Sequence, residues 1–296
     1  MTYLYYPGCS LKCSGRAYEE SMLPVFEALG VRLLELPDWN CCGATAYMSV
    51  DAQSAFLLAL RNLALAERHG DGNGGPVQLV APCAACYLAL TKVQHRIAEH
   101  PEVARGTAED LAAADLEYRG GVRVRHPLEV LVGDVGLPAI RSRVRAPLYG
   151  MRVACYYGCQ IVRPYAAFDD QFDPTTLDRL VEAIGAEPVR WPLKTRCCGG
   201  TLTGTLHEMG ARLSVLLVEE AVRRGASTLA TACPLCQFNL DCYQNRRGEL
   251  ATALPIVYFT QLLGLAFGIP AKRLGLHRHM IPLMPALVGA AGASHD

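Results

Sequence analysis

Short apolar runs alternate with amphipathic stretches along this chain, and the alternation occurs twice. The first half opens on the apolar run at 3–9 (YLYYPGC), which is followed by a helical pattern over Ala17–Leu29. The second half opens on the run at 153–159 (VACYYGC), which is followed by a helical pattern over Pro174–Ile184. Apolar strands separated by amphipathic helices predict an α/β fold with mostly parallel strands.

The match between the halves continues to their ends. Each half has a longer amphipathic helix, at Ser54–Arg68 and Glu208–Arg224, and then a strand-like run that leads into a C-x-x-C motif. The final segments match as well, because HPLEVLVGDVGL at 126–137 resembles YFTQLLGLAFGI in the second half. One long repeat indicates a duplicated domain and not a solenoid. We therefore expect two homologous domains, 1–149 and 150–296, related by a pseudo-two-fold axis.

Five cysteines recur in the same order in each half, as a single cysteine, a Cys-Cys-Gly doublet and a C-x-x-C pair. The first set is Cys9, Cys41, Cys42, Cys83 and Cys86. The second set is Cys159, Cys197, Cys198, Cys233 and Cys236. A buried free cysteine is common and inert in protein cores, but two matching sets of five indicate a metal or cluster site that was duplicated with its scaffold.

Composition limits the class of protein. Hydrophobic residues make up 51% of the chain and charged residues 19%, which is typical of a folded globular protein. The net charge is zero and no basic stripe is present, so nucleic acid is not an expected partner. No apolar stretch is long enough to span a membrane. Thirteen cysteines without a signal-peptide pattern predict a reducing compartment, the cytoplasm.

Thiolates are the preferred ligands of soft metals and iron–sulfur clusters. A C-x-x-C turn brings two sulfurs to one centre, and the glycine after each doublet permits a sharp bend of the backbone. Structural zinc takes four ligands, and so does an ordinary cubane cluster. Five thiols per set exceed both. Either one cysteine is a spare or redox-active thiol, or the centre is larger or unusually shaped, and zinc in either site stays an alternative.

The motifs YYPGCSLK, DWNCCGAT, YYGCQIVRP, CCGG, CPLCQFNLD and QLLGLAFG resemble the B subunit of heterodisulfide reductases and its bacterial relatives in sulfur oxidation. The resemblance covers essentially the whole chain. In that family each cysteine-rich CCG domain supplies five thiolates to a non-cubane [4Fe–4S] cluster. The two clusters face each other, and a disulfide between them is split, one sulfur to each cluster.

The resemblance therefore implies that all ten cysteines of the two sets are cluster ligands, and that the doublets of both domains approach one cavity. It implies a catalytic role in a heterodisulfide-reductase-like complex, cleaving or forming an S–S bond of a small-molecule or protein-bound substrate. The implied partners are the C-type protein of such complexes, which carries cubane [4Fe–4S] clusters, and the A-type flavoprotein. Two alternatives are a non-catalytic electron relay between a dehydrogenase and a quinone or flavin partner, and a zinc-stabilised scaffold protein.

Other side chains near the motifs are weaker candidates. Five basic residues are candidates for binding an anionic substrate, with solvated surface or compensation of cluster charge as the alternative: Lys12, Arg16, Arg163, Lys194 and Arg196. His207, expected near the start of a helix, is a candidate proton donor, with helix capping or packing as the alternative. Three cysteines have no counterpart in the repeat and are assigned no role: Cys13, Cys155 and Cys242.

Overall fold

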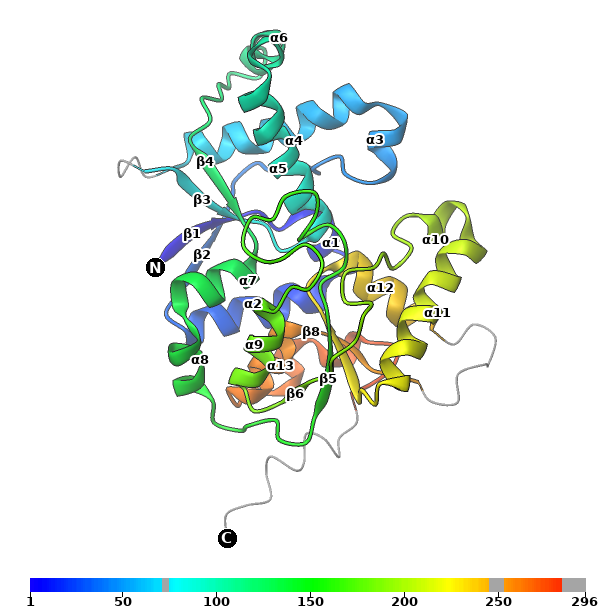
Figure 1. The fold of residues 1–296 in the computed structure, drawn as a ribbon. Helices are drawn as coiled ribbons and strands as arrows, with labels where there is room; N and C mark the ends of the chain where they lie inside the picture. Colours follow the sequence, from blue (N-terminus) through cyan, green and yellow to red (C-terminus); the bar gives the residue numbers. More distant parts are fainter. Residues whose placement is uncertain (71–74, 245–252, 284–296) are drawn as a thin grey trace.

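The computed structural model of the chain describes residues 1–70, 75–244 and 253–283. Two four-stranded sheets dominate it, with strand orders β2-β1-β3-β4 and β6-β5-β7-β8. Every strand pair is parallel. The sheets occupy the upper and lower parts of Figure 1, with helices around both. The prediction of an α/β protein with two homologous parallel-sheet domains is confirmed.

The elements of the two halves follow one another in matching order. The N-terminal half contains β1 (Thr2–Tyr5), α1 (Gly8–Leu11), α2 (Arg16–Ala28), β2 (Arg32–Glu35), α3 (Ala46–Val50), α4 (Ala52–Arg68), β3 (Val77–Val80), α5 (Ala84–Glu99), α6 (Pro101–Ala112), β4 (Val122–Arg125), α7 (Pro127–Glu129), the π-helical turn η1 (Val130–Val135) and α8 (Leu137–Arg143). The C-terminal half contains β5 (Arg152–Tyr156), α9 (Thr176–Ala183), β6 (Glu187–Pro188), α10 (Leu202–Thr205), α11 (His207–Arg223), β7 (Thr228–Thr231), α12 (Pro234–Tyr243), β8 (Ile256–Tyr258), α13 (Phe259–Ala266) and the 3₁₀ turns η2 (Ala271–Leu274) and η3 (Leu276–Arg278).

Hydrophobic periodicity located α2, α4, α9 and α11 to within two residues at either end, but it did not predict α5, which follows the first C-x-x-C motif. Helix α4 begins two residues before the predicted Ser54, and α11 is displaced by one residue from the predicted Glu208–Arg224. These helices have continuous apolar faces that pack against the sheets, so their pattern is strong. The predicted boundary at 149/150 lies between α8 and β5, and it stays a prediction.

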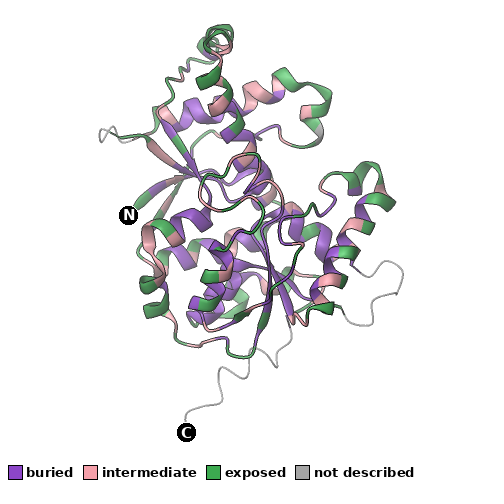
Figure 2. Ribbon diagram, viewed as in Figure 1, coloured by how far each residue is buried: buried purple, intermediate pink, exposed green. Residues whose placement is uncertain are grey.

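The two halves share a continuous interface. Helix α2 of the N-terminal half lies beside α13 of the C-terminal half, in the lower part of Figure 1. The buried hydroxyls of Ser21 and Thr260 are 2.6 Å apart there. At the edge of this contact Arg278 forms an ion pair with Glu20. Figure 2 shows buried residues extending from one sheet to the other through this region.

Two aromatic stacks cross the interface in reciprocal positions. Tyr18, nine residues after Cys9, stacks on Tyr258 with ring centroids 4.5 Å apart. Phe168, nine residues after Cys159, lies parallel to His126 at 6.2 Å. His126 directly follows β4, and Tyr258 is the matching residue of β8 in the strand register. Each half thus contributes the same two positions, which is the contact pattern of a two-fold interface.

Candidate iron–sulfur site

The cysteines lie where parallel strands deliver ligands. Cys9 follows β1, and Cys83 follows β3, so both come from the carboxyl edge of neighbouring strands. After β1 the chain forms β2 on one side of β1 and then β3 on the other side of β1. The topological switch point of the sheet therefore lies between β1 and β3. Crevices at such points are where open parallel sheets bind ligands. Cys159 and Cys233 occupy the same places after β5 and β7.

Within the first set the thiols form a string of contacts. The Sγ atoms of Cys41 and Cys9 are 3.8 Å apart, and those of Cys42 and Cys86 are 3.3 Å apart. The neighbouring thiols Cys41 and Cys42, and likewise Cys83 and Cys86, are close enough to affect each other's pKa. Backbone N–H groups also donate to these sulfurs, that of Gly43 to Cys41 and that of Ala44 to Cys42.

The second set repeats this string. The Sγ atoms of Cys198 and Cys236 are 3.4 Å apart, and hydrogen bonds join Cys159 to Cys197 and Cys197 to Cys198. The free thiol of Cys233 also interacts with that of Cys236 and affects its pKa. The buried amide of the asparagine on α12, residue 239, adds a donor to the Cys198 sulfur at 3.5 Å.

The two strings meet at one point between the halves. The buried side chains of Cys83 and Cys233 interact across the interface, and each affects the pKa of the other; their exposed fractions are only 3% and 1%. The ten thiols therefore form one continuous series across the interface. We expected the doublets of both halves to approach a common cavity, but the contact between the sets runs through the C-x-x-C pairs. The strand order explains the difference, because the C-x-x-C motif follows a central strand and the doublet follows an edge strand.

Accessibility changes along the series. The outer thiols Cys9, Cys41 and Cys197 are exposed, and Cys159 is partly exposed. The six inner thiols are buried. Hydrogen bonds from Cys42 and Cys9 lower the pKa of Cys41, and those from Cys159 and Cys198 lower the pKa of Cys197. The thiolate is the form of cysteine that binds metals, so the outer cysteine of each doublet is predisposed to ligation.

Glycines shape the turns that hold the thiols. Gly43 and Gly199, which follow the doublets, have φ of +68° and +98°. A Cβ atom on Gly199 would lie 2.7 Å from the carbonyl oxygen of Gly210 on α11. Positive φ and close backbone approach both exclude other side chains, which confirms the expected bend after each doublet.

The residues present fit a soft-metal or iron–sulfur group. Each half offers five thiols, and the donors around them are other thiols, backbone N–H groups and one amide. Such donors stabilise the negative charge of cluster sulfur. In the described part of the chain, no three His, Cys, Asp or Glu side chains are arranged around the position of a single metal ion. The sulfur atoms instead contact one another in pairs along each set.

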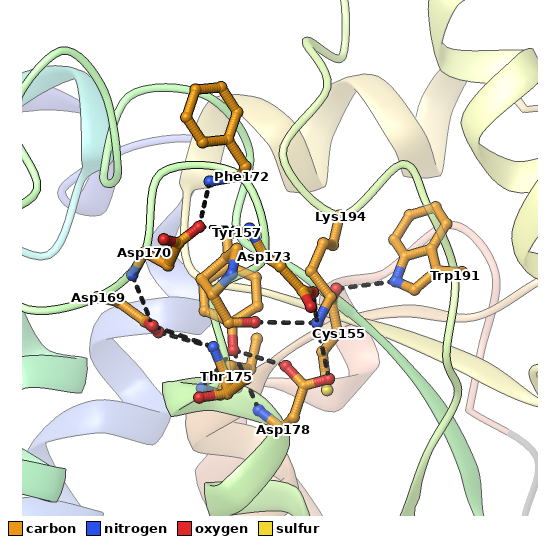
Figure 3. Close-up of polar contacts among 12 residues, drawn as sticks. Cys155, Tyr157, Asp169, Asp170, Phe172, Asp173, Thr175, Asp178, Trp191 and Lys194 are labelled. Atoms are coloured by element: carbon orange, nitrogen blue, oxygen red, sulfur yellow. Dashed lines mark hydrogen bonds and ion pairs between the residues drawn. The ribbon is translucent and has the colours of Figure 1, made fainter.

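The five basic candidates occupy separate environments. Lys12 forms ion pairs with Glu19 (2.6 Å) and Glu35 (2.8 Å). Lys194 is buried and forms ion pairs with Asp173 (3.3 Å) and Asp178 (3.1 Å), as Figure 3 shows. Each lysine therefore already faces two carboxylates. A role of either in substrate binding stays a prediction.

The three arginines have fewer counter-charges. Arg16 is largely exposed and 3.7 Å from Glu20. Arg163 donates to the carbonyl oxygen of Thr195, and its positive charge helps to lower the pKa of Cys197 after the larger effect of hydrogen bonds from neighbouring thiols. Arg196 is exposed. Of the five candidates, Arg163 is the one with an electrostatic contact to a thiol of the sets.

His207 begins α11, as expected. Its Nδ1 lies 2.8 Å from the carbonyl oxygen of Thr203, and its buried Nε2 has no hydrogen-bond partner in the part of the chain that the structure describes. The ring packs edge-on against Tyr243. These contacts describe a packed histidine, and its role as a proton donor stays a prediction.

The three unassigned cysteines lie outside the series. Cys155 is buried in β5, where its Sγ lies 4.0 Å from the carbonyl oxygen of Val153. Cys13 is exposed, and Cys242 is partly exposed on α12. The described contacts place all three apart from the two sets.

Sequence reasoning missed the residues at the junction. The Nε2 atom of His126 lies 3.1 Å from the carbonyl oxygen of Pro82 and 3.3 Å from that of Ala232. These carbonyls come from different halves, and each directly precedes the first cysteine of a C-x-x-C motif. Its Nδ1 accepts the backbone N–H of Leu128, so Nε2 carries the proton. The matching segments 126–137 and 258–269 were the available signal, because they place His126 and Tyr258 in equivalent positions.

The fold and the thiol series define a class of protein: a duplicated parallel α/β domain with five cysteines at each carboxyl edge. The sequence model of the cysteine-rich domain named CCG matches residues 3–91 and 153–241, which contain both sets. The chain belongs to this CCG family and is related to the B subunit of heterodisulfide reductases, which are oxidoreductases. Its clustered cysteines are consistent with iron–sulfur binding.

Several curated proteins are similar over nearly their whole length. The membrane anchor protein of the 8-methylmenaquinol:fumarate reductase of Wolinella succinogenes is 31% identical over 94% of this chain and 96% of that protein. A protein of Archaeoglobus profundus that is named as like the B subunit of heterodisulfide reductase is 31% identical over 91% and 92%. The B subunit of the ferredoxin:CoB-CoM heterodisulfide reductase of Methanosarcina mazei is 27% identical over 93% and 92%.

A solved structure shares the fold. The crystal structure of a hypothetical protein from Helicobacter pylori superposes with a TM-score of 0.75 at 15% identity, over 96% of this chain. This chain spans about half of that one, 52% of its length. Within the described residues, no helix combines the length and the apolar character needed to cross a bilayer.

Proposed function

We propose that this chain is the iron–sulfur redox component of a larger oxidoreductase, in which the two five-thiol sets bind two facing [4Fe–4S] clusters of the non-cubane type. We further propose that it cleaves or forms an S–S bond between them. The observation that carries this proposal is the approach of Cys83 to Cys233, since His126 bridges the carbonyl oxygens of the residues directly before them, Pro82 (3.1 Å) and Ala232 (3.3 Å). Five thiols per centre, where a cubane takes four, favour the non-cubane type.

Cleavage of a disulfide requires two electrons and two protons and yields two thiols. When bound, the clusters supply one-electron storage and iron sites for sulfur, and two such centres together supply both electrons. The chain's own thiols hold the centres, and its buried tyrosines around them exclude water. Arg16, Arg163 and Arg196 are the cations we propose for the anionic ends of a thiol substrate, and His207 is the proposed proton donor.

The electrons must come from another protein. We propose a partner with cubane [4Fe–4S] clusters, of the C type found in heterodisulfide reductases, itself connected to a flavoprotein of the A type. The relative from Methanosarcina mazei carries ferredoxin in the name of its complex, in keeping with such a donor. The exposed outer thiols Cys9, Cys41 and Cys197 mark where a donor can approach each set.

A second candidate function is electron relay without substrate chemistry. The relative from Wolinella succinogenes, 31% identical, is named as the membrane anchor of a quinol-linked fumarate reductase. The burial of Cys83 and Cys233 also suits a relay, since electrons cross a closed junction and a substrate does not. In this interpretation the chain conducts electrons between a quinol-linked partner and a dehydrogenase.

One experiment distinguishes the two functions. The anaerobically purified chain is reduced, either a small disulfide or a soluble quinone is added, and thiol release and reoxidation of the chain are followed. Disulfide chemistry predicts two thiols released per two electrons lost, in the absence of quinone. Relay predicts reoxidation by the quinone and no thiol release from any disulfide in the panel, which would comprise cystine, oxidised glutathione and CoB-CoM heterodisulfide. A colourless protein that contains zinc would contradict both.

A further inference from the structure

Three buried hydroxyls beside the junction of the two thiol sets donate to no described protein group, although the Tyr258 side chain takes part in the N-terminal cap of α13. They are the phenols of Tyr18 and Tyr258 and the hydroxyl of Thr231, and all three side chains are fully buried. Thr231 and Tyr258 are direct partners in the register of β7 and β8, so two of the three residues are neighbours in the sheet. A buried hydroxyl that donates no hydrogen bond is destabilising, because it has lost its bonds to water without replacement. Three of them together therefore indicate an acceptor that is supplied from outside the protein.

The two phenols come from different halves and lie together at the junction. Tyr18 comes from the N-terminal half and Tyr258 from the C-terminal half, and their rings are stacked with an interplanar angle of 7°. Both interact electrostatically with Cys83 and Cys233, the thiols that join the two sets. The phenols therefore flank the one point at which the sulfur sites of both halves meet.

Packing alone does not require these hydroxyls. The reciprocal stack on the other side of the interface uses Phe168 and His126, and neither side chain carries a hydroxyl. Other tyrosines near the thiols have satisfied hydroxyls: Tyr6 donates to the Asn40 carbonyl, and Tyr156 donates to the Arg196 carbonyl. The pair at the junction is thus distinguished by donors that point at no described protein group.

We propose that Tyr18 and Tyr258 donate hydrogen bonds to anionic sulfur held at the junction of the two sets, and so tune the redox centre there. The inference rests on the iron–sulfur centres of the proposed function. A donor aimed at sulfur stabilises negative charge, which favours the reduced state and raises the reduction potential. The sulfur is either that of the bound cluster or that of a substrate, and the two sources give different results below.

The test compares Tyr18→Phe, Tyr258→Phe and the double variant with Tyr156→Phe as the matched control, all in the full, cluster-loaded chain. Each substitution keeps the ring and removes one hydroxyl. The midpoint potentials are measured by titration monitored by EPR. If the acceptor is cluster sulfur, both single variants shift the potential of a cluster to more negative values without substrate, the double variant shifts it further, and Tyr156→Phe leaves it unchanged.

If the acceptor is substrate sulfur, the potentials without substrate stay the same and KM for the disulfide rises in the two junction variants only. A cluster-loaded protein in which neither the potentials nor KM respond would overturn the inference, and an altered melting temperature alone would show a purely structural role. Failure of the proposed function would be recognised separately, since a protein that binds only zinc shows no cluster reduction potential. A protein that binds its clusters but lacks disulfide activity still shows whether the reduction potential without substrate changes in the tyrosine variants.

Discussion

Two neighbouring residues of one doublet, Cys197 and Cys198, differ in every respect that matters for ligation. Cys197 is exposed, and hydrogen bonds from Cys159 and Cys198 lower its pKa, whereas Cys198 is buried and accepts a hydrogen bond from the side-chain amide of Asn239. The carbonyl of Cys198 accepts the Ser214 hydroxyl on α11. The turn at Gly199 therefore directs one sulfur outward and one inward, so that both reach the same string of thiols.

This arrangement predicts a selective loss when the inner cysteine is removed. In the Cys198→Ala variant, we expect the protein to lose the metal of the second set and keep that of the first, or about half of its iron. Disulfide activity should fall to background, because one centre alone supplies one electron. Iron analysis of the purified variant measures this.

The control is Cys13→Ala, which removes an exposed thiol outside the sets. We expect it to retain full iron content. Equal iron loss in both variants would contradict the assignment of the sets, and full retention in Cys198→Ala would make that cysteine a spare thiol.

At the scale of elements, the turns after the doublets are the least tolerant parts of the site. Gly199→Ala would place a Cβ atom against the backbone of α11 at a residue with φ of +98°. We expect loss of iron from the second set and a large drop in the denaturation midpoint. The matched control is Gly150→Ala, at φ of +77° with open space around the new Cβ, where only conformational strain of about 1–2 kcal/mol applies.

If Gly150→Ala and Gly199→Ala lower the denaturation midpoint equally and retain equal iron, close packing of the doublet turn against α11 is not needed for the site. A greater loss of iron and stability in Gly199→Ala would show that this packing holds the second set in place.

Local pattern was enough to predict four of the helices (α2, α4, α9 and α11) and the parallel sheets, because each depends on spacing within one segment, but it did not predict α5 or α12, which follow the C-x-x-C motifs. It was not enough to predict how the halves meet. The stack of Tyr18 on Tyr258 and the position of His126 depend on contacts between residues more than a hundred positions apart. The carboxylates around Lys194 were missed for the same reason, since they come from a loop and a helix that only the fold brings to this lysine.

At the scale of the whole molecule, His126 connects the two halves at the thiol junction. Burial lowers the pKa of His126 from its ordinary 6.5 to about 4, so the folded protein holds it neutral. A depressed folded pKa contributes stability that is complete above pH 6.5 and is lost as the pH falls toward 4. Between about pH 7 and pH 5 this loss is about 2 kcal/mol.

The prediction is that His126→Gln removes this part of the acid sensitivity. Its denaturation midpoint should be lower than the parent's at pH 7 because the bridge to Pro82 and Ala232 is altered, but it should fall less on going to pH 5. His69→Gln, at an exposed position after α4, should keep the parent's pH dependence. An unchanged pH dependence in His126→Gln would show that this histidine does not titrate on unfolding.

The central claim is that two duplicated sets of five thiols hold two iron–sulfur centres that meet between the halves. The most direct test is the metal and acid-labile sulfide content of the full chain, purified without oxygen. We expect about eight irons and about eight sulfides per chain, about four of each per set. Zinc as the main metal in both sets, with no labile sulfide, would contradict the claim.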